Sequence, residues 1–74
     1  MKYLSPRSKH IIRNHIAFTR DQASRFGEFP AVSWKTTAVR MLHSVTPHTP
    51  EDEAVAYFFV ARFAMRQLRR LGAL

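Results

Sequence analysis

The four histidines are the side chains with the clearest capacity for chemistry, as metal ligands or as general acids and bases. His10 and His15 are five residues apart, and so are His43 and His48. Two histidines that hold one metal from a single helix are usually four residues apart, because that spacing places both on one face. The spacing therefore predicts no metal site. His15 falls within the apolar arc of its helix, which is typical of a hydrogen-bonded histidine in a core or an interface.

The remaining residue types form no catalytic pattern. Glu51, Asp52 and Glu53 stand together at a helix start, where interaction with the helix dipole accounts for them. Ser, His and Asp have no spacing typical of a nucleophilic triad, and glycine at only Gly27 and Gly72 rules out a phosphate-binding loop. Cysteine is absent, which excludes disulfides and thiolate metal ligands. We therefore predict a non-enzymatic protein with no catalytic residues, no metal and no cofactor.

The charge balance indicates an acidic partner. Twelve Lys and Arg against five Asp and Glu give a net charge of +7, which favours nucleic acid, an acidic protein surface or an anionic membrane. No acid precedes Asp21, and none follows Arg62, although four arginines lie in that last segment. A chain of this length buries only about 60% of the surface that its unfolded form exposes, so a partner is also expected to add stability.

The N-terminus lacks the apolar core of a secretory signal, so we expect an intracellular, cytoplasmic protein. The alternative is an organellar protein, because the acid-free, Arg-containing first twenty residues resemble a transit peptide in composition. The apolar run from Ala54 to Val60 is interrupted by Arg62 and Arg66, well short of the ~20 residues that a membrane span needs. We therefore predict no transmembrane segment.

The elements that would position these residues are all helices. We predict an all-α fold, a small three- to four-helix bundle with a long, largely apolar C-terminal helix, formed as a single helical domain over residues 1–74. The expected helices are about 6–26, 31–45 and 50–71. The first becomes two if it breaks near Thr19, where Thr-Arg-Asp-Gln has the spacing of a capping box. The predicted caps and stops are Ser5 with Pro6, Gly27, Ser33, Thr49 with Pro50, and Gly72.

Helical periodicity assigns a face to each apolar stripe. The first helix is predicted to bury Ile11, Ile12, His15, Ile16, Thr19, Ala23 and Phe26. The second is predicted to bury Trp34, Ala38, Met41 and Val45, with Thr36, Thr37, Arg40 and His43 facing away. The last is predicted to bury Tyr57, Phe58, Ala61, Ala64, Met65 and Leu68.

The last helix then has a second apolar flank. Val55, Phe59 and Phe63 are spaced four residues apart on a side that three helices have little capacity to cover. Aromatic residues flanked by arginine are typical of protein interfaces. The predicted protein interface therefore comprises Val55, Phe59, Phe63, Arg62, Arg66 and Arg70, and it mediates either self-association, such as a homodimer, or binding to another protein. Complete burial of this flank by the first two helices is the alternative.

A second segment indicates nucleic acid. The stretch Gln-Ala-Ser-Arg-Phe-Gly at 22–27, followed by Pro-Ala-Val-Ser at 30–33, resembles the helix-turn-helix of bacterial repressors and of LysR-type regulators. The gap from Gly27 to Pro30 is one residue shorter than the LysR-type pattern, and Ser33 stands where that pattern has an aliphatic residue. The resemblance implies that Ser33, Lys35, Thr36 and Arg40 face the major groove while Arg13, Arg20 and Arg25 reach phosphates.

These two interpretations give two candidate functions. We predict a regulator or minor assembly subunit that acts through protein contacts of its last helix. The alternative is a helix-turn-helix-like DNA-binding regulator that dimerises through the same helix. The residues predicted to contact nucleic acid or an acidic partner are Lys9, Arg13, Arg20, Arg25, Lys35, Thr36 and Arg40.

Overall fold

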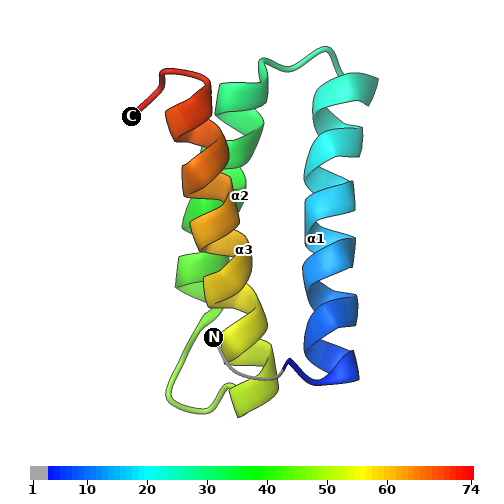
Figure 1. The fold of residues 1–74 in the computed structure, drawn as a ribbon, viewed down its shortest axis with the longest axis vertical. Helices are drawn as coiled ribbons and strands as arrows, with labels where there is room; N and C mark the ends of the chain where they lie inside the picture. The colour runs from blue at the N-terminus through cyan, green and yellow to red at the C-terminus, as the bar shows by residue number, and fades with distance from the viewer. Residues whose placement is uncertain (1–3) are drawn as a thin grey trace.

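The chain folds into a small bundle of α-helices, seen in a computed structural model that describes residues 4–74 (Figure 1). Helix α1 spans Pro6–Arg25, α2 spans Pro30–Ser44 and α3 spans Glu51–Arg70. The chain reverses direction at each connection, so α1 and α3 both run antiparallel to α2. These described residues contain no strand, and every helix end lies within one residue of its predicted position.

Local sequence signals explain two of the helix ends. The Ser5 hydroxyl accepts a hydrogen bond from the Ser8 N–H at 3.0 Å, with Pro6 at the first helical position. Helix α3 ends with the Ala73 N–H donating to the Leu68 carbonyl at 2.8 Å and the Gly72 N–H donating to the Arg69 carbonyl at 3.1 Å. This is the Schellman arrangement, and it requires the positive φ of 73° that Gly72 adopts.

The structure selects the unbroken first helix of the two alternatives, and two capping predictions are wrong. Helix α1 is continuous through Thr19, because the Thr19 hydroxyl donates to the carbonyl of His15 inside the helix and caps no second helix. Ser33 does not cap α2, which begins at Pro30, three residues earlier. Thr49 does not cap α3 either, because its hydroxyl accepts from the Thr46 N–H at 2.9 Å within the preceding turn.

The core forms where α3 packs against both other helices. It contains two clusters of buried side chains, the first made of Ile12, Met41, Ala56, Val60 and Ala61 and the second of Trp34, Ala38, Ala64 and Leu68. Ile16 packs against both clusters and connects them. Alanines on facing sides of α2 and α3 allow close approach, and this pair of helices has the most extensive contact in the bundle.

The buried faces are rotated from the predicted ones. Phe58, Met65 and Phe26 were expected in the core but are 47%, 41% and 68% exposed. Thr37 was expected to face away but is 3% exposed. The reason in α3 is that Ala56, Val60 and Ala64 occupy the centre of its buried face, and these small side chains bring the helices together while the large aromatic residues are displaced to the flanks.

Candidate interaction surface

A surface pocket of about 200 Å³ lies on α3 and is lined by Phe59, Arg62, Phe63 and Arg66. We call these four residues the aromatic groove. All four belong to the interface predicted from the sequence. The spacing of three and four residues explains their proximity, because it places them on one side of a helix.

Contacts within the bundle hold the phenylalanines of the aromatic groove. The Phe63 ring lies 5.5 Å from the Trp34 ring, measured between centroids, and the guanidinium carbon of Arg20 lies 5.9 Å from the Phe63 centroid. Phe59 packs against the core cluster that contains Ile12 and Val60. Both phenylalanines are therefore half-buried, which lies between the exposed flank predicted from the sequence and the alternative of complete burial.

One basic residue of α1, Arg20, borders this groove. Arg20 reaches Phe63, which places its side of α1 next to α3. Lys9 and Arg13 precede Arg20 by eleven and seven residues, so they lie on the same stripe of the helix. On α3, Arg62, Arg66 and Arg70 continue the positive charge at intervals of four. All six of these basic residues are exposed. The structure thus places Arg20, one of the residues predicted to contact an acidic partner, next to the predicted interface on α3.

Acidic side chains have other contacts in the described residues. Asp21 is paired with Arg25 at 3.4 Å on an exposed part of α1. The Glu28 carboxylate accepts a hydrogen bond from Ser33. Arg7 pairs with Glu53 and approaches Asp52 at 4.0 Å, near the start of α3. Glu51 lies at that same start, at the other end of α3 from Arg66 and Arg70. The positive potential of the aromatic groove is therefore not neutralised by neighbours.

Val55 belongs to a different surface. It lines a pocket of about 390 Å³ with Ser5, Ser8, Glu51 and Asp52, where the first turns of α1 and α3 meet. There the buried Ser8 hydroxyl donates to the Asp52 carbonyl at 2.8 Å and joins the two helices. The structure thus separates Val55 from the pocket that Phe59 and Phe63 share.

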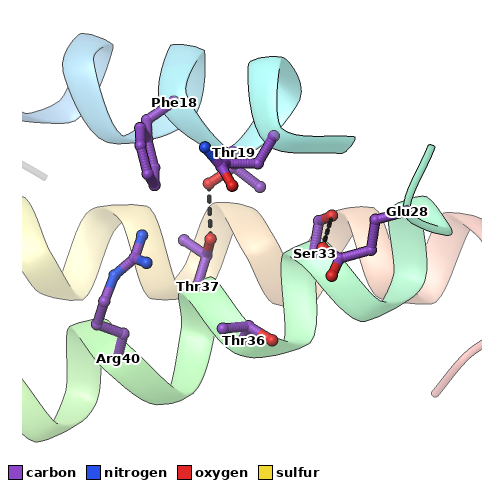
Figure 2. Close-up of a pocket in the computed structure, with 8 residues that line it drawn as sticks. Phe18, Thr19, Glu28, Ser33, Thr36, Thr37 and Arg40 are labelled. Carbon is purple, nitrogen blue, oxygen red and sulfur yellow. Dashed lines mark hydrogen bonds between the residues drawn. The ribbon is translucent and has the colours of Figure 1, made fainter. Parts of the chain in front are cut away.

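Helices α1 and α2 meet along a polar seam that the sequence did not reveal (Figure 2). Thr19 and Thr37 are buried, and their hydroxyl oxygens lie 2.6 Å apart. Because the Thr19 proton is directed to the His15 carbonyl at 2.8 Å, Thr37 is the donor in this pair. The spacing in the sequence could have indicated that Thr37 is buried, because it lies three residues after Trp34 and four before Met41, at the edge of the buried face.

This seam borders a pocket of about 200 Å³ that contains residues of both helices (Figure 2). Its lining consists of Phe18, Thr19, Gln22, Glu28, Ser33, Thr36, Thr37 and Arg40. Arg40 extends towards Phe18, with its guanidinium carbon 5.4 Å from the ring centre. Every buried side-chain nitrogen and oxygen in residues 4–74 has a hydrogen-bond partner, so the buried hydroxyls of Thr19, Ser33 and Thr37 are already satisfied by the protein.

Of the residues expected to face the major groove of DNA, some are exposed and one is buried. Ser33 is 4% exposed and donates its hydroxyl proton to Glu28, so the expectation that it faces a groove of DNA is wrong. Lys35, Thr36 and Arg40 are exposed on α2. Helices α1 and α2 lie antiparallel, whereas the two helices of a helix-turn-helix cross at about 90–120°.

His15 occupies the other end of the α1–α2 seam. Its ring makes an edge-to-face contact with Tyr57, with 5.8 Å between centroids. Burial, and then the positive charge of Arg40, lower the pKa of His15 below its ordinary value of 6.5. At neutral pH the neutral imidazole is therefore the favoured form of His15 in the folded protein.

Within residues 4–74, no three His, Asp or Glu side chains gather as a metal ion would require. None of the helices described combines the length and apolar composition needed to cross a bilayer. Comparison with known protein families, curated proteins and solved structures found no match to this chain.

Proposed function

We propose that the protein is a small, non-enzymatic binding protein whose aromatic groove on α3 docks an acidic segment of a partner protein. The observation that carries this proposal is the pocket itself, in which Phe59 and Phe63 form the apolar part and Arg62 and Arg66 supply positive charge. Aromatic residues and arginine are the types enriched at the energetically important centres of protein interfaces.

The groove is pre-organised for binding. Phe63 is held between Trp34 and Arg20, and Phe59 is packed against the core, so neither ring has to be immobilised when a partner arrives. Ordering a mobile side chain at an interface costs about 0.5–1.5 kcal/mol. Two rings that are already ordered therefore contribute more of their contact energy to affinity.

The charge pattern on α3 supports an acidic partner. Arg62, Arg66 and Arg70 are repeated at intervals of four, and like charges at this spacing destabilise a helix by roughly 0.2–0.5 kcal/mol per pair. Carboxylates of a partner would relieve this repulsion on binding. A second copy of the chain is a poorer match, because it carries the same net charge of +7.

Sequence-specific DNA binding is the second candidate function. It is supported by the exposure of Lys35, Thr36 and Arg40 on α2. The antiparallel hairpin of α1 and α2 and the burial of Ser33 argue against the docking mode of a helix-turn-helix. Protein binding is therefore the function that the geometry supports better.

The proposal is tested by affinity capture from a lysate of the native source, treated with nuclease, using the wild-type protein and two charge-reversed variants. Arg66→Glu changes the wall of the aromatic groove. Lys35→Glu makes the same charge change at an exposed position on α2, outside the groove. The captured partner should bind Arg66→Glu at least about tenfold more weakly and bind Lys35→Glu almost as tightly as wild type.

Sedimentation velocity of the purified protein provides the second measurement. We expect a monomer at micromolar concentration that forms a complex once the captured partner is added. Equal affinities of the two variants for the partner would contradict the proposal. So would a stable homodimer that Arg66→Glu dissociates, since the groove would then be occupied by a second copy.

A further inference from the structure

One end of the bundle carries apolar side chains that have little contact with the rest of the protein. The α1–α2 connection and the C-terminal tail both lie at this end (Figure 1). In the connection, Phe26 and Phe29 are 68% and 80% exposed, the highest values among the large hydrophobic side chains that are exposed. In the tail, Leu71 and Leu74 are 50% and 64% exposed. We call these four residues the apolar tip.

Basic residues surround the apolar tip. Arg25, which pairs with Asp21, directly precedes Phe26, and Arg69 and Arg70 lie in the last turn of α3; all three arginines are exposed. The one acid within the loop, Glu28, accepts a hydrogen bond from Ser33 and extends towards α2 in Figure 2. The tip therefore combines exposed apolar side chains with positive charge at its rim.

Two backbone groups of the loop are paired within the protein. The Phe26 N–H donates to the Gln22 carbonyl at 3.1 Å, and the Phe29 carbonyl accepts from the N–H groups of Val32 and Ser33 at 2.9 and 3.2 Å. Gly27 makes the turn with a φ of 62°. The other backbone groups of residues 26–29 have no backbone partner among the described residues, so the loop fits the polar headgroup region, where hydrogen-bond partners remain available, and not the acyl interior.

We infer that the apolar tip is a membrane-docking site that inserts into the headgroup region of an anionic lipid bilayer. This inference is independent of the proposed function, because the aromatic groove contributes none of the four residues. Aromatic and aliphatic side chains that enter the acyl boundary, with basic residues at headgroup level, are the usual composition of an interfacial anchor. The net charge of +7 adds attraction to anionic lipid over the whole molecule.

The area of the tip decides between a bilayer and a protein as its occupant. Aromatic side chains present on the order of 200 Å² each, so the exposed parts of Phe26 and Phe29 amount to about 300 Å², and the smaller Leu71 and Leu74 raise the total to no more than about 500 Å². A specific protein interface needs about 800 Å² on each partner. A bilayer accepts isolated projecting side chains, because lipid fills the space around each of them, so it fits the small, protruding tip better.

Vesicle co-sedimentation of the full chain tests the inference. The probes are vesicles of phosphatidylcholine alone and of phosphatidylcholine with phosphatidylserine at about 2:1. Wild type should bind the mixed vesicles and bind phosphatidylcholine much more weakly. Phe29→Ser should lower the partition into mixed vesicles by roughly tenfold, and Phe26→Ser by a similar factor. Arg69→Glu should lower it by at least about fivefold.

The matched control is Phe58→Ser, which removes a phenylalanine that is also exposed, at 47%, from the side of α3. It should bind the mixed vesicles like wild type. Circular dichroism establishes that all variants fold, which is expected because the replaced side chains are exposed. The inference is overturned if wild type ignores the mixed vesicles, if Phe26→Ser with Phe29→Ser binds them like wild type, or if the tip residues instead mediate self-association in sedimentation velocity without lipid.

Discussion

The guanidinium carbon of Arg20 lies 5.9 Å from the centre of the Phe63 ring and brings a charged side chain of α1 onto an aromatic residue of α3. The same ring contacts Trp34 of α2, so Phe63 touches both other helices. One residue thus contributes both to the packing of the bundle and to the lining of the aromatic groove. A substitution there changes stability and binding together, which is why charge reversal at Arg66 is the cleaner test of function.

The first prediction concerns this dual role. Phe63→Ala should lower the free energy of unfolding by about 2 kcal/mol, less than the 3–5 kcal/mol of a fully buried phenylalanine because Phe63 is only half-buried. Phe58→Ala is the matched control on the same helix and should cost less than about 1 kcal/mol, since Phe58 is 47% exposed. Urea unfolding monitored through the fluorescence of Trp34 gives both values. Equal losses would show that the two side chains are buried alike.

The helices could be predicted because their ends depend on local chemistry. Ser5 with Pro6 fixes the start of α1, and Gly27 and Gly72 supply the positive φ that follows α1 and α3. Such signals act over a few residues and are readable in the sequence. The capping roles of Ser33 and Thr49 were not predicted correctly, because each hydroxyl found a different partner a few residues away.

The composition of the surface was harder to predict, because it depends on how far each helix is rotated about its axis. Periodicity showed that α3 has apolar residues on almost every side, yet it could not show which side packs against α1 and α2. The alanines determine which face of α3 is buried: Ala56 and Ala64 are fully buried, and Phe58 and Met65 are exposed. The contact of Arg20 with Phe63 joins positions far apart in the sequence, so no local pattern indicated it.

The second prediction concerns the buried hydroxyl pair of Thr19 and Thr37. Thr37→Val should destabilise the protein by about 1–2 kcal/mol, because it removes a donor to Thr19 and leaves a lone pair of that buried oxygen unpaired. Thr19→Val should cost at least as much, since it also removes the bond to the His15 carbonyl. The double variant should cost less than the two single losses together, because the stranded partner is gone as well. Urea unfolding of all four proteins measures this difference, and strict additivity would contradict it.

The third prediction concerns pH. The pKa of His15 is lowered in the folded state by burial and by Arg40, so the unfolded chain takes up a proton first as the pH falls. The contribution of His15 to stability is therefore complete above about pH 6.5 and is lost as the pH falls through the folded-state value. Arg40→Gln removes the nearby charge and should make the loss of stability between about pH 7 and pH 5 less steep than in wild type.

The control for this pH effect is Lys35→Gln, which removes a positive charge from an exposed position on the same helix, five residues from Arg40. Its loss of stability over the same range should parallel that of wild type. Urea unfolding at several pH values, with chemical shifts of the His15 ring as a direct readout, makes the comparison. A wild-type protein that gains stability on acidification in this range would reverse the sign and contradict the prediction.

The fourth prediction separates a protein partner from DNA. Any protein with a charge of +7 attracts DNA at low salt, so the measurement belongs near physiological ionic strength and uses a pool of random duplexes. We expect that no duplex is enriched there, and that log affinity falls with log salt at a slope of about −0.9 for each phosphate contacted. Arg66→Ala and Arg40→Ala should then weaken the residual binding alike, because both remove one charge without a sequence-reading contact. Enrichment of one duplex that is lost in Arg40→Ala and kept in Arg66→Ala would establish base recognition from α2. In that case the partner would be DNA, bound by the exposed face of α2, and not an acidic protein segment.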